Sequence, residues 1–533
     1  MDIALHNGKI YTGSGFAQAI SVKDGIITAV GTNEDILSAC KGSLTVDLAG
    51  KTVIPGLIDS HLHMFNLGAS LLSVQLHGAA SITECIERGR KFITANSPEP
   101  GSVIIGRGWN DDYFTDEHRM LCRLDLDKIS IEHPIILTRA CGHALACNTK
   151  ALTLAGVTCD TPQVDGGEFE LGADNLPNGI FKENAMGYIR KLIEFPSLNE
   201  TKLILQTAMK HASAQGITSV QTNDMHEASR NIIWQAYEEL AKEELSTVRS
   251  YQQCHFDTLD GFKQFLSEGY KTGYGSEMNK IGPLKLFVDG SLGARTSLMR
   301  QDFSDMPGNR GIMCISQEEL DAFVALAQQN GMQVAVHAIG DRAIEMTLDA
   351  YKKALPAGEN PMRHGIVHCQ ITDMPLLERF ANQHISALVQ PIFLHYDMHI
   401  AADRVGEALA STSYAFGTMD KLGIHTSYGT DAPVEDLKTM ENIYCSVTRK
   451  DLKGNPEDGW YPKEKVSLSK AIDHYTVDGA YNSFEEYKKG RLLPGYLGDM
   501  AVLSRDIFSC EPDSIKDIKI AMTILGGKIV YQA

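Results

Sequence analysis

Short apolar runs separated by tight-turn signals occupy both ends of the chain. Asn7-Gly8, Asp24-Gly25 and Gly526-Gly527 favour hairpin turns, because Asn, Asp and Gly tolerate positive φ. The apolar runs lie at residues 3–6, 9–12, 19–23, 26–30, 499–504, 518–525 and 528–531. We therefore predict that segments 1–56 and 477–533 together build one small β-sandwich domain.

The middle of the chain instead alternates apolar strand-like runs with helical stretches. Three helical stretches end in glycine, at Gly216, Gly331 and Gly423, which is typical of a helix end before a buried parallel strand. The eight runs lie at residues 57–63, 217–221, 248–252, 284–288, 333–337, 365–369, 387–390 and 424–428. Eight strands with intervening helices predict an α/β fold, a (β/α)8 TIM barrel over 57–476.

One interval is too long for a single crossover helix. Between residues 63 and 217 the chain has strand-like runs of its own, at 102–106 and 134–138. We interpret about 70–205 as an α/β subdomain inserted after strand one. Because it follows that strand, we expect it to cover the mouth of the barrel.

Composition narrows the classes of partner and compartment. The chain has 533 residues, 43% of them hydrophobic, and a formal net charge of −18. Such acidity argues against nucleic acid and anionic membranes as partners. There is no run of 18 apolar residues, so we expect no transmembrane helix, and the N-terminus does not resemble a secretory signal. Eleven scattered cysteines favour a reducing compartment, and we expect a cytoplasmic protein.

Polar side chains end several of the predicted barrel strands, where barrel active sites lie. His61 and His63 alternate with Leu62, so on a strand they face the same way and suit one divalent metal ion. The other such residues are Lys285, His337, His368 and Asp431. Each has a structural alternative: a histidine can be a core residue, a lysine can reach solvent, and an aspartate can cap a helix. Their convergence on one rim favours a metal centre.

These residues lie in motifs that resemble the amidohydrolase superfamily, in particular the amidohydrolase 3 branch that includes N-substituted formamide deformylase and the YtcJ-like proteins. The motifs span most of the chain and are IPGLIDSHLH, LKLFVDGSLGART, VHAIGDRAI, RHGIVHCQ and GTDAPVE. The segment TRACGHALACNTKAL resembles a further element of that branch, with Cys141 where the branch usually has Asp and with His143 retained.

The resemblance implies a role for each of these residues. His61 and His63 would bind one metal ion together with Asp431, and His337 and His368 would bind a second. Lys285 would be carboxylated and bridge the two ions, which we expect to be zinc. A metal-bridged hydroxide would attack an amide-type carbon, Asp431 would serve as general acid and base, and His143 would help to stabilise the oxyanion.

Weaker candidates for substrate contact are Ser291, Arg295 and Trp109, for which loop closure or core packing is the alternative. The function implied is hydrolysis of a non-peptide C–N bond in a small molecule, by a protein that could be a homodimer. Two alternatives stay open: a mononuclear deaminase-like hydrolase with one metal ion and an unmodified lysine, and a non-catalytic scaffold homologue.

Overall fold

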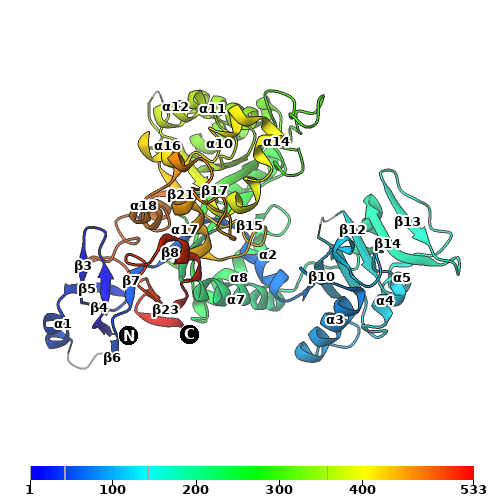
Figure 1. Ribbon diagram of the computed structural model, residues 1–533, viewed down its shortest axis with the longest axis horizontal. Helices are drawn as coiled ribbons and strands as arrows, with labels where there is room; N and C mark the ends of the chain where they lie inside the picture. The colour runs from blue at the N-terminus through cyan, green and yellow to red at the C-terminus, as the bar shows by residue number, and fades with distance from the viewer. Residues whose placement is uncertain (1, 41–43, 141–142, 357) are drawn as a thin grey trace. The chain divides into compact units, whose positions relative to one another are not determined.

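The computed structural model describes residues 2–40, 44–140, 143–356 and 358–533 (Figure 1). Cys141, which departs from the motif of the resembled branch, lies outside the described residues. The chain forms two compact units. The first unit comprises Met1–Met64 with Ala208–Ala533, and the second comprises Phe65–Thr207.

An eight-stranded parallel sheet forms the centre of the first unit and confirms the predicted (β/α)8 architecture. Its strands, in sheet order, are β8 (Leu57–Leu62), β15 (Ile217–His226), β16 (Arg249–His255), β17 (Asn279–Phe287), β18 (Val334–Ala338), β19 (Gly365–His368), β20 (Ser386–Val389) and β21 (Thr426–Tyr428). The first and last strands meet at their carboxyl ends. There the Asp431 N–H donates to the His61 carbonyl at 2.8 Å, and the His63 N–H donates to the Ala432 carbonyl at 2.8 Å.

Helices follow the barrel strands, and their ends have the expected chemistry. Ser316 and Glu319 form a reciprocal capping box at α10 (Gln317–Gln329), which satisfies amide groups that lack a partner within the helix. Gly331 has φ of 66°, as expected of a residue that ends a helix before a strand. The other helices after barrel strands are α8 (Arg230–Lys242), α9 (Leu259–Ser267), α11 (Asp341–Ala354), α12 (Met374–Asn382), α13 (Leu394–Asp397), α14 (Ala401–Val405), α15 (Glu407–Ala410), α16 (Phe416–Lys421), α17 (Thr439–Thr448), α18 (Leu468–His474) and α19 (Val477–Asn482).

Two barrel strands extend further than the hydrophobic pattern predicts. β15 continues to His226 rather than ending at residue 221, and β16 continues to His255 rather than to 252. The added part of β15 is polar, yet its residues from Thr222 to Asp224 are buried. Polar residues that are hydrogen-bonded inside a protein break the apolar run without ending the strand.

The terminal segments supply two further sheets. One is four-stranded in the order β5-β4-β1-β6, and the other is six-stranded in the order β24-β23-β22-β7-β2-β3. A shared core that includes Ile3, Val53 and Ile524 packs between strands from both ends of the chain. The strands are β1 (Ile3–His6), β2 (Lys9–Tyr11), β3 (Phe16–Ala17), β4 (Ala19–Lys23), β5 (Ile26–Gly31), β6 (Leu44–Asp47), β7 (Thr52–Pro55), β22 (Met500–Leu503), β23 (Ile520–Leu525) and β24 (Lys528–Gln532). Helix α1 (Asn33–Ala39) follows β5.

The second unit has its own six-stranded mixed sheet, in the order β13-β14-β12-β11-β10-β9. Two separate apolar clusters, one around Trp109 and one around Phe181, give it its own core. Its strands are β9 (Val74–Gln75), β10 (Ile104–Trp109), β11 (Ile135–Arg139), β12 (Ala144–Cys147), β13 (Gly167–Leu171) and β14 (Pro177–Glu183). Its helices are α2 (Met64–Leu71), α3 (Ile82–Asn96), α4 (Arg123–Asp127), α5 (Thr149–Ala155) and α6 (Gly187–Arg190), and α7 (Leu198–Ala214) leads to β15.

Two negative findings concern the described residues. None of their helices is both long and apolar enough to cross a membrane. The ten cysteines among them are all free thiols, five of them buried. The absence of disulfides in this part of the chain agrees with the scattered cysteine spacing.

A buried ion pair joins the barrel to the terminal sheets. Arg249, at the start of β16, donates through Nε and Nη2 to the Asp499 carboxylate at 2.8 and 3.1 Å, and these side chains are 8% and 5% exposed. Removing one partner leaves an uncompensated buried charge. We therefore expect Arg249→Met to lower the free energy of unfolding by about 3–5 kcal/mol, as measured by urea denaturation.

The matched control is Lys263→Met, which removes an exposed pair with Asp260 and should change the free energy of unfolding far less, because solvent screens that pair. The double variant Arg249→Met/Asp499→Leu should recover part of the loss, because it leaves no unpaired charge. Equal effects of Arg249→Met and Lys263→Met would show that the buried pair does not hold the sheets to the barrel.

Candidate metal centre

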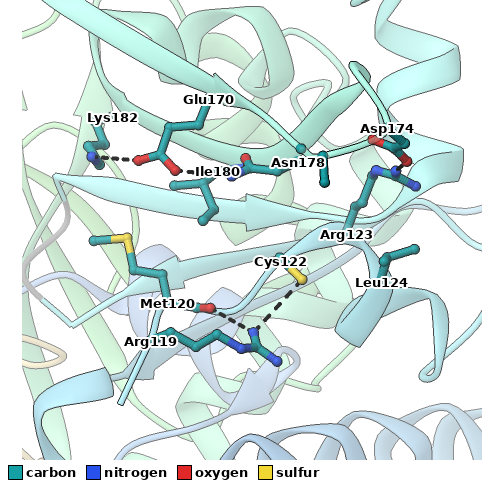
Figure 2. A pocket seen from close by; sticks show the side chains of 12 residues that line it. Arg119, Met120, Cys122, Arg123, Leu124, Glu170, Asp174, Asn178, Ile180 and Lys182 are labelled. Carbon is teal, nitrogen blue, oxygen red and sulfur yellow. Dashed lines mark hydrogen bonds and ion pairs between the residues drawn. The ribbon is translucent and has the colours of Figure 1, made fainter. Parts of the chain in front are cut away.

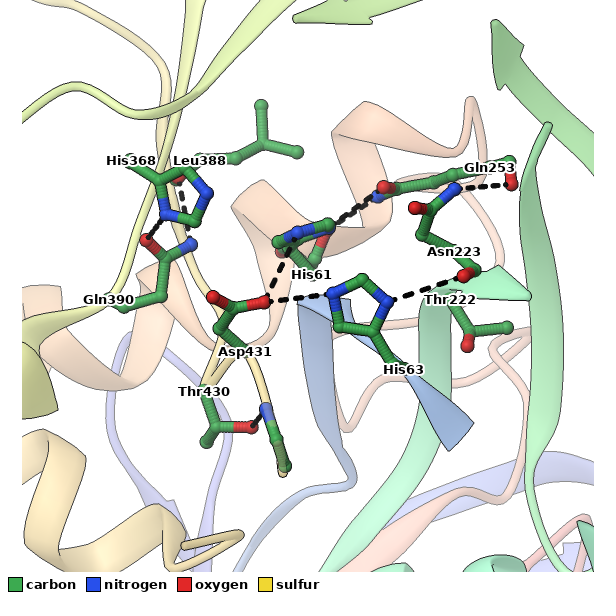
Figure 3. Close-up of polar contacts among 12 residues, drawn as sticks. His61, His63, Thr222, Asn223, Gln253, His368, Leu388, Gln390, Thr430 and Asp431 are labelled. Carbon is green, nitrogen blue, oxygen red and sulfur yellow. Dashed lines mark hydrogen bonds and ion pairs between the residues drawn. The ribbon is translucent and has the colours of Figure 1, made fainter. Parts of the chain in front are cut away.

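Three side chains at the closing seam of the barrel gather into one cluster (Figure 3). The Oδ1 atom of Asp431 lies 3.4 Å from Nε2 of His61 and 3.1 Å from Nε2 of His63. Among the described residues, these three form the group whose ligand atoms all lie within 4.8 Å of one another. Two imidazoles and a carboxylate are ligands that suit a divalent ion such as zinc.

A neighbouring amide fixes the tautomer of His61. Gln253 donates its side-chain N–H to the carbonyls of Ser60 and Gln221, so its oxygen faces His61. Nδ1 of His61 lies 2.8 Å from that oxygen and must be the donor. The lone pair of His61 is then on Nε2, the nitrogen that faces Asp431.

The same arrangement recurs at the other three histidines. Nδ1 of His368 lies 2.8 Å from the Gln390 oxygen, Nδ1 of His63 lies 3.3 Å from the Asn223 carbonyl, and Nε2 of His337 lies 3.0 Å from the Gly290 carbonyl. Each imidazole thus directs one nitrogen to a fixed oxygen and leaves the other for a further partner, which at His63 is the Asp431 carboxylate. This is how the metal-binding histidines of proteins are held.

The four imidazoles form one contiguous group. Ring centroids are separated by 5.2 Å between His61 and His63, by 5.6 Å between His61 and His368, and by 4.4 Å between His368 and His337. Burial is the largest cause that lowers the pKa of His61, His337 and His368, that of His337 to about 3. These rings are therefore neutral near pH 7 and have lone pairs to offer.

Lys285 lies within this group and is completely buried. Its Nζ has no hydrogen-bond partner among the described residues and lies 3.8 Å from the centroid of the Phe287 ring. Burial lowers the pKa of the amine to about 7, although Asp431 and Asp289 act in the opposite direction. A buried ammonium without a hydrogen-bond acceptor is costly, so the site favours a neutral or modified amine.

Backbone strain marks the same positions. His368 and Asp431 have φ of 80° and 59°, and Cys369, which follows His368, has φ of 50°. Side chains other than glycine rarely adopt these angles, and such residues concentrate at active sites. The hydrogen bond from the Asp431 N–H to His61 holds one of the strained residues in place.

Asp59, on β8, stabilises the closing seam through hydrogen bonds. Its carboxylate accepts from the Thr430 hydroxyl at 2.7 Å and from the N–H groups of Thr430 and His61 at 3.2 Å. Burial raises the pKa of Asp59 to about 7. In the sequence, Asp59 stood out only as a residue of the motif that contains His61 and His63. In the structure its hydrogen bonds orient the backbone at His61 and at Thr430, next to Asp431.

A second pair of histidines, which sequence reasoning missed, ends β15 and β16. His226 pairs in register with His255, and His255 pairs in register with Lys285. Burial, followed by His255 and His63, lowers the pKa of His226 to about 4. Both residues lie in the parts of β15 and β16 that extend beyond the predicted apolar runs.

Two predicted substrate residues are used for loop structure. Arg295 forms a bidentate ion pair with Asp305 at 3.0 and 2.8 Å, and Asp305 also pairs with Arg404. Ser291 accepts from the Ala294 N–H and lies in the turn that Thr296 closes. Both residues thus stabilise the loop after β17, which was the structural alternative.

The second unit contains the other two candidates. Trp109 is fully buried and donates its indole N–H to the Leu137 carbonyl at 3.1 Å, so it is a core residue and not a pocket residue. His143 is 70% exposed, with Nδ1 3.0 Å from the Glu183 carboxylate. Its proposed action on an oxyanion stays a prediction.

The second unit also holds two cavities of its own. The larger, of about 750 Å³, is shown in Figure 2. Its basic groups are already paired, Arg119 with Asp125, Arg123 with Asp174, and Lys182 with Glu168 and Glu170. The smaller, of about 460 Å³, is lined by His143 and Glu183 among others. Because their charges are neutralised, these cavities do not match the chemistry of the metal cluster.

Comparison with known proteins agrees with this geometry. The model of the Amidohydrolase family matches residues 44–531. The chain is 31% identical to "Putative amidohydrolase YtcJ" of Bacillus subtilis, covering 100% of both proteins. It is 24% identical to "N-substituted formamide deformylase" of Arthrobacter pascens, covering 97% of this chain and 95% of that one.

A solved structure has the same overall fold. It is an uncharacterized metal-dependent hydrolase from Pyrococcus furiosus, with a TM-score of 0.79 and 28% identity, covering 95% of this chain and 99% of that one. The chain belongs to the amidohydrolase family.

Proposed function

We propose that the protein hydrolyses a non-peptide C–N bond, of the amide or formamide type, in a small molecule, with the help of one or two divalent metal ions. The observation that carries this proposal is the tautomer pattern at the barrel rim. Four imidazoles each direct one nitrogen to a fixed oxygen and leave the other for a further partner, and a carboxylate and a buried lysine lie among them. Such a donor set has no evident structural purpose without a cation.

The cluster of His61, His63 and Asp431 supports one ion, and the neighbouring histidines would extend the site to two. His61, His63 and Asp431 would hold one, and His337 and His368 would hold the other. A bound zinc ion supplies a Lewis acid that polarises a carbonyl and lowers the pKa of water. Nε2 of His63 lies 3.1 Å from the Asp431 carboxylate. Burial lowers the pKa of His63, but Asp431 outweighs it and raises that pKa, so a proton lies between the two groups or a bound cation would take its place.

Lys285 would carry a carboxyl group. Its neutral Nζ would attack carbon dioxide, forming a C–N bond and releasing one proton, and leave an anionic carbamate. The lowered pKa of Lys285, about 7, supports a reactive free amine. The carbamate would give this buried position two oxygen atoms suited to divalent ions and would remove the cost of a buried ammonium without an acceptor.

Asp431 would move the proton. Its carboxylate is 9% exposed and faces both His61 and His63, while its backbone is fixed by the seam. It would accept a proton from the attacking water and donate it to the leaving nitrogen, as a general base and then a general acid. Both Gln253 and Gln390 would keep the imidazoles oriented during this transfer.

The two alternatives predict different metal contents. A mononuclear deaminase-like hydrolase would hold one ion and keep Lys285 unmodified, whereas a scaffold would need neither. The complete set of lone pairs at His337 and His368 favours two ions. The relative named N-substituted formamide deformylase supports formamides as the first substrates to test. A cytoplasmic location remains a proposal from composition, and a homodimer remains a proposal.

Asp431→Asn should lower kcat/KM by roughly 10²- to 10⁴-fold, because an amide cannot accept and return the proton. The measurement is hydrolysis of N-substituted formamides, N-acyl amines and cyclic amides by zinc-loaded protein, with zinc determined on the same sample. Asp436→Asn is the control, because Asp436 is 77% exposed in the same loop. Full activity of zinc-loaded Asp431→Asn would refute the proton-transfer role.

Lys285→Ala should weaken metal binding by at least about 10- to 100-fold and abolish turnover, because no carbamate can form. Added propionate should restore part of both, since its carboxylate can occupy the space left by the lysine side chain. Wild-type protein with propionate is the control and should show no gain. Wild-type zinc content and activity in the variant without propionate would show that Lys285 bridges no ions.

A further inference from the structure

The pair His226 and His255 lies beside the metal cluster but does not belong to it. Both residues stand at carboxyl ends of neighbouring barrel strands, in one register row with Lys285. Residues paired in register on adjacent strands point to the same face of a sheet. The two imidazoles therefore face the same side of the barrel wall as the buried lysine.

A continuous run of rings links the pair to the predicted metal ligands. Ring centroids are 5.6 Å apart between His226 and His255, 5.1 Å between His255 and Phe287, and 5.5 Å between Phe287 and His337. On the other side, β15 carries both His226 and Asn223, whose carbonyl lies 3.3 Å from Nδ1 of His63. The pair is thus attached to the cluster at both ends.

The hydrogen bond of His255 leaves one of its nitrogens for another partner. Nδ1 of His255 lies 3.0 Å from the Lys285 carbonyl and must donate to it, so the lone pair is on Nε2. His226 lies beside His255, with ring centroids 5.6 Å apart. Both side chains are partly exposed, that of His255 by 21%. Two accessible acceptors then stand next to the reacting centre.

The surroundings of the pair are acidic. Asp257 places its carboxylate 3.3 Å from Nε2 of His255, and Glu227 accepts from the Asp257 N–H at 3.0 Å. The basic residue of the same register row is Lys285, whose Nζ lies 3.8 Å from the centroid of the Phe287 ring. At this distance Nε2 and the carboxylate need a proton or a cation between them, and the carboxylate would repel an anionic ligand.

We propose that His226 and His255, together with the Asp257 carboxylate, form a substrate subsite that binds a protonated amino group on the part of the substrate that does not react. This inference rests on the proposed C–N hydrolysis, because it defines which small amides the site would prefer. The two lone pairs and the carboxylate would accept the N–H groups of the ammonium. A site built from such acceptors discriminates strongly against an analogue that has no donor.

The test compares two matched series of probes. N-Formyl diamines with two to five methylene groups carry an ammonium, and N-alkylformamides of the same length carry a methyl group instead. Wild-type protein should prefer the ammonium probe of at least one length by about tenfold or more in kcat/KM. His226→Phe and His255→Phe should each lower that ratio toward one while zinc content stays at the wild-type value.

The control variant is His425→Phe. His425 precedes β21 at the opposite end of the barrel, where its ring stacks on Tyr481 at 3.9 Å, and it is 45% exposed. This change should leave the probe ratio as in wild type. The proposal would be overturned if the probe ratio stayed high in both subsite variants. It would also be overturned if both series of probes slowed equally, because the two histidines would then have only a structural role. Loss of one zinc equivalent in either variant would also overturn it.

A binding measurement separates this inference from the proposed hydrolysis. Calorimetric titration of zinc-loaded protein with 1,4-diaminobutane should give binding that weakens at least fivefold in His226→Phe. If wild-type protein hydrolyses neither series but shows this difference, the hydrolytic function fails and the subsite stands. If it hydrolyses N-alkylformamides without preferring or binding the amine, the subsite fails and the function stands.

Discussion

The closing seam of the barrel is the constraint on which the proposed centre depends. The Asp431 N–H donates to the His61 carbonyl and the His63 N–H donates to the Ala432 carbonyl, so residues far apart in the chain become neighbours. Asp59 reinforces the seam through Thr430. If β8 and β21 did not meet here, no carboxylate would face the two imidazoles. The strained backbone of Asp431 shows that this placement has a conformational cost, which the surrounding hydrogen bonds offset.

The barrel tolerates the buried histidines of the cluster because neighbouring polar groups satisfy their hydrogen bonds. Each histidine donates to an oxygen whose own position is fixed, in two cases by an amide that is anchored to strand carbonyls. Lys285 is the exception, because its Nζ has no such partner in the described part of the chain. An uncompensated buried amine is hard to explain by stability and is well explained by modification. The metal-binding proposal and the carbamate proposal therefore rest on different observations.

Much of the fold followed from the sequence because the buried strands are apolar and the turns contain Gly, Asn and Asp. The set of strand-ending residues followed from the rule that barrel sites lie at carboxyl ends. The rest could not follow. Gln253 and Gln390 carry no pattern that tells them from surface amides, and the buried polar end of β15 concealed His226. The partners of Arg295 and the burial of Trp109 depend on tertiary contacts that spacing does not reveal.

The central claim is that Lys285 joins two ions in one centre. A crystal structure of zinc-loaded protein, grown with bicarbonate and measured on both sides of the zinc absorption edge, tests it most directly. The account predicts two anomalous peaks about 3.5–4 Å apart, one beside His61 and His63 and one beside His337 and His368, with density for a carboxyl group on Nζ of Lys285. A single peak beside His61 and His63, with an unmodified lysine, would contradict the claim.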